Sequence, residues 1–158
     1  GKTCDRCCCN SLIIMEIPEP QFEFYHHIPV QIRFNDVDLF GHLNNSVYVE
    51  FFDMGKLLYF KQFMGGHFEK QASVPVVATI NCTFCTPTYI DDRLEVYTAV
   101  ASIGEKSLVL EQRIIDSNKN VKCIATTHMV NVDAKTGRPV PVTDEWRKAI
   151  SEYEHREL

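Results

Sequence analysis

Residues 33–48 read Arg33-Phe34-Asn35-Asp36-Val37-Asp38-Leu39-Phe40-Gly41-His42-Leu43-Asn44-Asn45-Ser46-Val47-Tyr48, and the rest of the chain is organised around them. A strand-like run passes through a polar loop and opens directly into an apolar helical pattern. The loop holds two carboxylates, one histidine and two asparagines just before the first helical turn, whose unpaired backbone N–H groups favour negative charge. Such a loop can carry out chemistry on a carbonyl group, with an oxyanion against the N–H groups and a carboxylate or imidazole beside it.

The composition indicates one globular domain. A chain of 158 residues is long enough for one substantial core and short for a second domain. Hydrophobic residues make up 45% and charged residues 23%, which disfavours both disorder and a membrane-spanning segment. The formal net charge is −5 and Lys and Arg are scattered, whereas nucleic-acid binders present a basic face. No nucleic-acid or membrane partner is therefore expected.

The cysteines and the N-terminal residues predict a cytoplasmic protein. The apolar run at residues 12–15 is too short for a secretory signal, and the cysteine count of seven is odd. Free buried thiols are expected within strand-like runs, at Cys82, Cys85 and Cys123. Residues 1–21 are predicted to be an N-terminal extension with little structure, and residues 22–158 a single domain.

A second cysteine cluster at the N-terminus raises the alternative of a metal site. Cys4 and Cys7 have the spacing of zinc ligands, and Cys8 and Cys9 follow at once. A closed zinc site needs four ligands that converge from defined directions, which consecutive cysteines do poorly. No metal site is therefore predicted.

Periodicity and turn residues predict the order of the elements. A first strand is expected over 24–34 and a long helix over 46–64, ended by Gly65-Gly66. Alternating or clustered apolar residues predict four further strands, over 76–86, 93–103, 107–116 and 121–133. Thr143 is the expected N-cap of a short helix that reaches about Glu154. One strand, one helix and a run of four strands indicate an α+β domain with an antiparallel sheet.

Two side-chain patterns predict which faces are buried. In the long helix, apolar residues recur at helical spacing and form a face wide enough for burial on more than one side: Val47, Phe51, Met54 and Leu58, flanked by Tyr48, Phe52 and Tyr59. In the strand that follows, alternate residues are expected on one face: Val76, Ala78, Ile80, Cys82 and Phe84.

The order Asp-x-Asp-x-x-Gly-His-x-Asn-Asn-x-x-Tyr resembles the signature of the hotdog-fold acyl-CoA thioesterases, and more narrowly of the 4-hydroxybenzoyl-CoA thioesterase-like acyl-CoA thioester hydrolases. The resemblance covers nearly all of residues 22–142 and includes Pro87, Asp92, the Gly104-x-x-Ser107 turn and a closing Asp-x-x-Thr-Gly-Arg-Pro. It implies a hotdog fold, in which an antiparallel sheet of about five strands wraps around a long central helix, with a short C-terminal helix. It also implies a thioesterase without a metal or a cofactor, other than the coenzyme A of its substrate, or an acyl carrier protein in its place.

Carried over to this chain, the resemblance implies a role for each loop residue. Asp38 would be the nucleophile or general base, His42 would orient water or support the acid, and a backbone N–H near Asn45 would polarise the carbonyl. The same resemblance assigns substrate binding to Asn44, Tyr48, Gly104, Lys106 and Ser107. The chemistry of the loop agrees, because thioester hydrolysis needs an attacking oxygen, a base and an oxyanion partner, and all three can come from this loop.

Each loop residue also has a structural interpretation. Asp36 fits a role in bonding loop N–H groups better than catalysis. His42 can simply fill the loop, and Asn44 and Asn45 can cap the helix. Phe40 is bulky and directly precedes Gly41, so it can narrow the acyl entrance.

Two rival functions stay open at this point. A hotdog dehydratase or hydratase would also place an acid and a histidine near the helix, although at a spacing different from that of Asp36, Asp38 and His42. A non-catalytic acyl-CoA sensor would bind the ligand without turnover. In each case an unpaired edge strand favours association, so a homodimer or homotetramer is expected.

Overall fold

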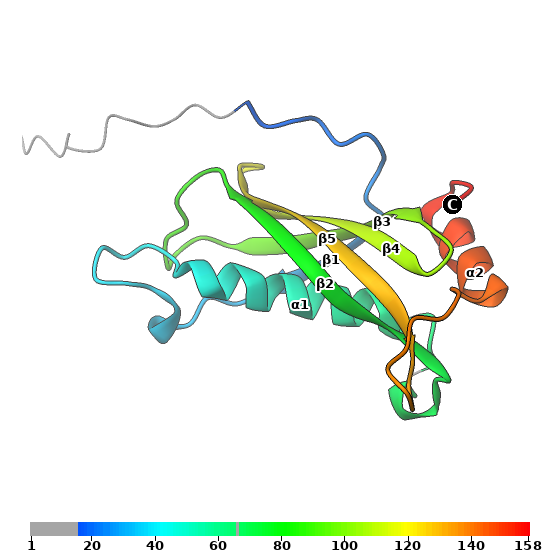
Figure 1. The fold of residues 1–158 in the computed structure, drawn as a ribbon. Coiled ribbons are helices and arrows are strands. Elements are labelled where there is room, and N and C mark those ends of the chain that lie inside the picture. Colours follow the sequence, from blue (N-terminus) through cyan, green and yellow to red (C-terminus); the bar gives the residue numbers. More distant parts are fainter. Residues whose placement is uncertain (1–15, 66) are drawn as a thin grey trace, which may run out of the picture.

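The computed structural model describes residues 16–65 and 67–158, which leaves the Cys4–Cys9 cluster outside the described residues. Its elements confirm the predicted α+β class (Figure 1). Short 3-10 turns lie at Phe34–Asp36 and Phe68–Lys70. The helices and strands, in chain order, are β1 His26–Val30, α1 Asn45–Lys61, β2 Ser73–Phe84, β3 Leu94–Ile103, β4 Ser107–Asp116, β5 Val121–Asp133 and α2 Asp144–Glu154.

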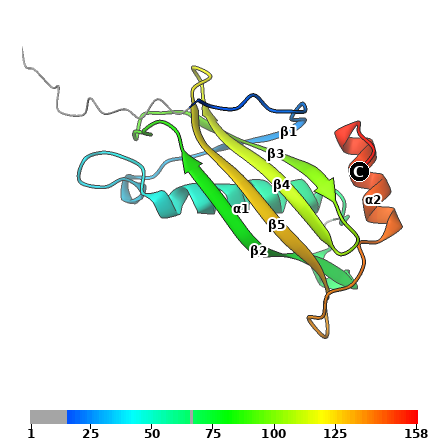
Figure 2. The ribbon, with the colours of Figure 1, turned by 45° about the horizontal axis from the view of Figure 1, so that its top comes forward.

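The five strands form one antiparallel sheet in the order β1-β3-β4-β5-β2 (Figure 2). β4 and β5 have the predicted bounds, and β3 begins one residue late. β1 is shorter than predicted, because its pairing with β3 ends where Val30 meets Leu94, the first residue of β3. β2 begins three residues early and includes Pro75, which an edge strand tolerates because one side of its backbone needs no partner.

A β-bulge at Ala78 decides which β2 side chains face α1. The register with β5 shifts between Val77 and Thr79. Opposed side chains of an antiparallel pair share a face, so Val77 lies on the same face as residues 80, 82 and 84, and Val76 on the other. The predicted alternation is right from Ile80 onward and wrong at Val76, because the extra residue of the bulge reverses it.

The helix α1 packs one face against the inner surface of the sheet (Figure 1). Its buried residues are Val47, Tyr48, Phe51, Phe52, Gly55, Tyr59 and Phe60. Of the predicted apolar face, Val47 and Phe51 are buried, but Met54 is 48% exposed in this chain. Leu57 is 47% exposed, and Gly55 faces the sheet. The predicted end at Gly65-Gly66 is also late. The N–H groups of Phe63 and Met64 bond to carbonyls three residues back, which tightens the chain into turns after Lys61.

Gly55 leaves no room for a side chain between α1 and the sheet. A Cβ there would lie 2.7 Å from Val96 Cγ1 and 3.0 Å from Thr98 Oγ1. Gly55→Ala gains about 1 kcal/mol of helix propensity, but overpacking costs about 1–3 kcal/mol. We therefore expect a lower free energy of unfolding in urea, while Ser46→Ala, at an exposed position of the same helix, should not lower it. A Gly55→Ala protein as stable as the parent would contradict this close packing.

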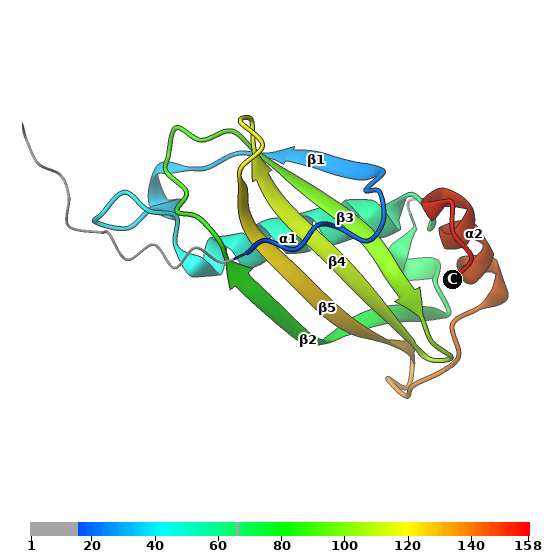
Figure 3. The same cartoon turned by 90° about the horizontal axis from the view of Figure 1, so that it is seen from above.

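The C-terminal helix and the N-terminal segment cover other parts of the sheet. The predicted N-cap of α2 is confirmed, because Thr143 Oγ1 accepts a hydrogen bond from the Trp146 N–H at 3.2 Å. The Trp146 ring stacks on Phe60 of α1 at a centroid distance of 5.8 Å. Residues 16–25 cross the outer face of the sheet (Figure 3). Within residues 16–65 and 67–158, no helix is both long and apolar enough to span a membrane.

Candidate functional site

The loop between β1 and α1 is closed on itself by backbone pairing. Val37 and Leu43 form an antiparallel bridge, and the Asp38 N–H donates to the His42 carbonyl at 2.8 Å. The Gly41 N–H donates to the Asp38 carbonyl at 3.0 Å, with φ of +79° at Gly41. This left-handed conformation favours glycine, so the glycine of the motif is a backbone requirement of the loop.

The Asp38 carboxylate divides its two oxygens between different environments. Its Oδ1 accepts hydrogen bonds from the N–H groups of Phe40 at 2.8 Å and His42 at 3.1 Å. Its Oδ2 has no hydrogen bond to any of the residues described here, and the side chain is exposed. One oxygen therefore holds the loop, and the other is available to a substrate or a water molecule. Leu39 and Phe40 beside it also point into solvent, so Phe40 does not narrow an entrance within one chain.

Asp36 is buried and bonds a backbone N–H group of its own loop, as its structural interpretation predicted. The carboxylate is only 3% exposed and accepts from the Arg33 N–H at 2.7 Å and from Arg33 Nη2 at 3.1 Å. The side-chain hydrogen bond from Arg33 lowers the pKa of Asp36, against the opposing effect of burial. The Asp36 carbonyl also accepts from the Asn44 N–H at 2.8 Å. Asp36 thus joins the start of the loop to the residue before α1.

The lowered pKa of Asp36 predicts an acid-dependent part of the stability. A carboxyl group whose folded pKa lies below its unfolded value of about 3.9 stabilises the fold above that value, and the contribution is lost as the pH falls through the folded pKa. Asp36→Asn should therefore lose stability at neutral pH and show a flatter dependence below about pH 4. Urea unfolding at neutral and acid pH measures both. Equal pH slopes for parent and variant would contradict the role given to the Arg33–Asp36 pair.

His42, Asn45 and Tyr48 line one cavity of about 230 Å³ at the start of α1. The opposite wall comes from the end of β2 and the following loop, at Phe84, Cys85, Thr86, Pro87 and Thr88. Within the described residues the N–H of Asn45 has no acceptor, as expected in the first turn of a helix. Asp38 and Asn44 do not line this cavity. Asn44 precedes α1, but its side chain makes no capping hydrogen bond, so capping by that side chain is not seen.

Thr88 joins the loop, the helix and the cavity wall. Its carbonyl accepts from the Leu43 N–H at 2.8 Å, and its Oγ1 accepts from the buried Tyr48 hydroxyl at 2.9 Å. Burial raises the pKa of Tyr48, which therefore stays a neutral donor. The His42 ring packs edge-on against Tyr89 at a centroid distance of 5.1 Å. Sequence reasoning missed Thr88, and its only signal was the neighbouring Pro87 of the β2–β3 connection.

The predicted substrate-binding turn lies elsewhere in the chain. Gly104 and Ser107 close the β3–β4 turn through an N–H to carbonyl bond of 2.8 Å, and the Lys106 carbonyl accepts from the Asn131 N–H. Arg147 of α2 donates to the Gly104 carbonyl at 2.9 Å. The turn is therefore beside α2, while the loop at residues 38–45 lies at the other end of α1, about 25 Å away for a helix of this length (Figure 2). One chain does not bring these two sets of residues together.

No metal centre is found in the described part of the chain. It contains no group of three or more His, Cys, Asp or Glu side chains that could hold an ion. Cys82, Cys85 and Cys123 are free, as predicted, although only Cys123 is fully buried and Cys85 lies one residue past β2. Burial raises the pKa of the Cys85 thiol, which makes it a poor nucleophile at the cavity wall.

Comparison with known proteins identifies the family. Residues 32–150 match the thioesterase-like superfamily. The acyl-CoA thioester hydrolase YbgC of Escherichia coli is 28% identical over 116 residues, which cover 70% of this chain and 84% of that protein. The uncharacterized protein YsmA of Bacillus subtilis is 27% identical over 130 residues, 82% of this chain and 86% of that protein.

A solved structure agrees with this assignment. The thioesterase of Thermus thermophilus, crystallised with coenzyme A and zinc, is 26% identical and superposes with a TM-score of 0.76 over 85% of this chain and 98% of that one. The five-stranded antiparallel sheet and the two helices correspond to the fold class that the sequence resemblance implied. Since the family match spans well over half of the sequence, the chain belongs to the thioesterase-like superfamily, whose reaction class is thioester hydrolysis.

Proposed function

We propose that this protein hydrolyses the thioester of an acyl-CoA, or of an acyl carrier protein, to a free acid and a thiol. The observation that carries the proposal is the geometry of Asp38 in the loop that leads into α1: its Oδ1 holds the loop, and its Oδ2 has no hydrogen bond to the described residues. A carboxylate in this place can attack the carbonyl carbon or remove a proton from water. The neighbouring cavity, lined by His42 and Asn45, supplies a place for the reacting carbonyl.

In the proposed reaction, the thioester carbonyl oxygen faces the free N–H of Asn45, which stabilises the developing oxyanion. As a general base, Asp38 takes a proton from water, the water oxygen adds to the carbonyl carbon, and the C–S bond breaks. As a nucleophile, Asp38 forms a mixed anhydride and releases the thiolate, and water then cleaves the anhydride. Either route gives one carboxylic acid and one thiol, and His42 would orient the water.

Product analysis tests this reaction against its rivals. The protein is incubated with short, long and aromatic acyl-CoAs, with a 2-enoyl-CoA and with an acyl carrier protein substrate, and products are identified by chromatography and mass spectrometry. Hydrolysis predicts free acid and free thiol in equal amounts. An acyl-CoA heavier by one water with its thioester intact would instead identify a hydratase. Unchanged substrate with a raised melting temperature would identify a sensor, and either result would overturn the proposal.

A homodimer through the β2 edge would complete this site. β2 spans 12 residues, and among the described residues it pairs only with β5, which leaves its other edge open. On the face of β2 that points toward α1, an exposed apolar strip follows that edge: Val77, Ile80 and Phe84. Open edges of this kind favour pairing, and a two-fold axis would match the strip with its own copy. Antiparallel pairing of two β2 edges sets the loop end of one subunit beside the α2 end of the other, so the partner's 104–107 turn could reach the substrate.

Ile80→Lys should convert the dimer to a monomer. The Ile80 side chain is part of the apolar strip. In a two-fold dimer, the lysine of one subunit would lie near that of its copy, and the two like charges would repel each other. Size-exclusion chromatography with light scattering measures the mass. Asn81→Lys, on the opposite face of the same strand, is the matched control and should stay dimeric. A monomeric parent would contradict this interface. Tetramer formation and a cytoplasmic location stay predictions from the sequence.

A further inference from the structure

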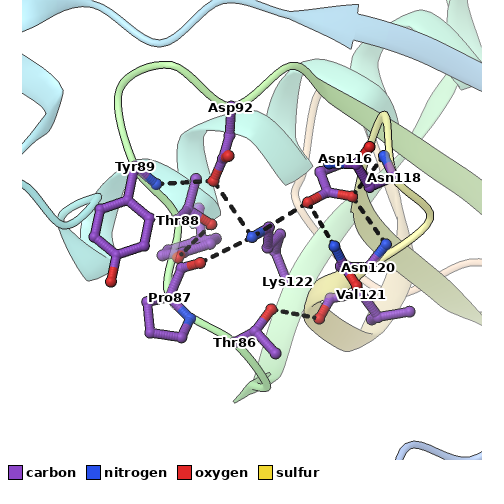
Figure 4. Close-up of polar contacts among 11 residues, drawn as sticks. Thr86, Pro87, Thr88, Tyr89, Asp92, Asp116, Asn118, Asn120, Val121 and Lys122 are labelled. Atoms are coloured by element: carbon purple, nitrogen blue, oxygen red, sulfur yellow. Dashed lines mark hydrogen bonds and ion pairs between the residues drawn. The ribbon is translucent and has the colours of Figure 1, made fainter. Parts of the chain in front are cut away.

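Lys122, the second residue of β5, places a buried ammonium group behind the cavity wall (Figure 4). Its side chain is 8% exposed. Its Nζ donates to the Pro87 carbonyl at 2.9 Å and lies 3.3 Å from Asp92 Oδ2 and 3.4 Å from Asp116 Oδ2. One ammonium group therefore joins β5 to the β2–β3 loop and to the β4–β5 hairpin.

The two carboxylates are themselves held in position. Asp116 Oδ1 accepts from the N–H groups of Asn118 and Asn120, both at 2.9 Å, and Asp92 Oδ2 accepts from the Tyr89 N–H at 2.9 Å. Burial opposes ionisation of Asp116, but the hydrogen bonds from Asn120 and Lys122 outweigh it, so its pKa is lowered. A buried ammonium needs such partners, because an unpaired charge in the interior is costly.

Lys122 holds the β2–β3 connection, and this connection contacts the loop between β1 and α1 and the first turn of α1. Pro87 accepts from Lys122, and the next residue, Thr88, bonds to both Leu43 and Tyr48. Residues 84–88 form one wall of the cavity, and residues 42–48 form the other. Removing the ammonium group would release the Pro87 carbonyl and leave two neighbouring carboxylates without their shared cation.

We propose that Lys122 is a positioning residue for thioester hydrolysis, which sets the separation of the two cavity walls and so the approach of the carbonyl to the Asn45 N–H. This inference rests on the proposed function. Lys122 does not line the cavity and does not touch the reacting atoms. Its effect should therefore appear in kcat, because misplacement of reacting groups slows the chemical step, while contacts along the carrier arm stay intact.

The test compares Lys122→Met with a matched buried charge at the other end of the molecule. Met keeps the length of the side chain and removes the charge and the donors. Glu154→Gln changes a buried carboxylate at the last residue of α2, remote from the cavity. With acyl-CoA as substrate and well below each melting temperature, we expect Lys122→Met to lower kcat by about 10- to 100-fold with little change in KM. Glu154→Gln should lower the melting temperature and leave kcat unchanged.

Two further variants make the outcome decisive. Lys122→Arg keeps a charged donor and should recover part of the lost kcat. Asp92→Asn keeps an acceptor for the Tyr89 N–H, lies nearer the surface and should lower kcat less than Lys122→Met, which gives a readout if Lys122→Met fails to fold. An active parent with Lys122→Met and Asp92→Asn at full kcat, or an equal loss in Glu154→Gln, would overturn the positioning role alone. A parent without turnover would overturn the proposed function and the positioning role together.

Discussion

Replacing Asp38 by asparagine is expected to lower kcat for acyl-CoA hydrolysis by about 10²- to 10⁴-fold, the range for loss of a positioned acid or base. Asparagine keeps an oxygen that can accept from the N–H groups of Phe40 and His42, so the loop should hold its shape. It removes the negative charge that would attack the carbonyl or accept a proton. Thiol release measures the rate, and circular dichroism checks the fold.

The neighbouring carboxylate supplies the control for this prediction. Asp36→Asn removes a buried charge that is paired with Arg33, and should lower the free energy of unfolding much more than the kcat of the folded protein. The two residues are two positions apart in the sequence. Asp38→Asn should mainly lower kcat, and Asp36→Asn should mainly lower the free energy of unfolding. An Asp38→Asn protein that keeps most of the parent kcat would show that Asp38 only closes the loop.

Glu154→Ala should cause the largest loss of stability among the single changes considered. The Glu154 carboxylate is 1% exposed, and its Oε1 accepts from the Tyr59 hydroxyl at 2.5 Å and from the Val100 N–H at 3.1 Å. Its Oε2 lies 3.5 Å from Arg156 Nη2. Burial, together with the nearby Glu154 charge, raises the pKa of Tyr59, which therefore stays a donor. This network fastens α2 to both α1 and β3.

The alanine variant leaves the Tyr59 hydroxyl and the Val100 N–H buried without an acceptor. We expect a loss of about 3–5 kcal/mol in the free energy of unfolding, measured in urea. Glu152→Ala, at an exposed position of the same helix, should change it by less than about 0.5 kcal/mol. Equal stability of the two variants would mean that the network contributes nothing to the docking of α2.

Sequence signals predicted the elements whose ends are set by nearby turn and capping residues. β4 and β5 have the expected bounds, because turn residues flank alternating runs, and Thr143 caps α2 as its type and position indicate. The bulge at Ala78 and the inward face of α1 at Gly55 were not predicted. The bulge depends on the pairing of β2 with β5, and the inward face of α1 depends on the strands that pack against Gly55. The periodicity of one element does not show which other elements will contact it.

The same distinction applies to the site. The motif residues from Asp36 to Tyr48 are close in the sequence, so a resemblance could locate their loop. Thr88 contacts the loop from the β2–β3 connection, and Lys122 of β5 holds that connection through the Pro87 carbonyl. A single threonine or lysine carries no sign of burial in the sequence. The turn at residues 104–107 was assigned to the substrate by resemblance, which gives no distances, and in this chain the turn lies beside α2.

The most direct test of the central claim is the amount of thiol that the parent releases from an excess of acyl-CoA, with Asp38→Asn measured beside it at the same oligomeric state. The account predicts many thiols released per subunit of the parent, and a rate at least about 100-fold lower for the variant. A parent that releases no thiol, but is stabilised by acyl-CoA, would contradict hydrolysis and make the protein a binder of acyl-CoA.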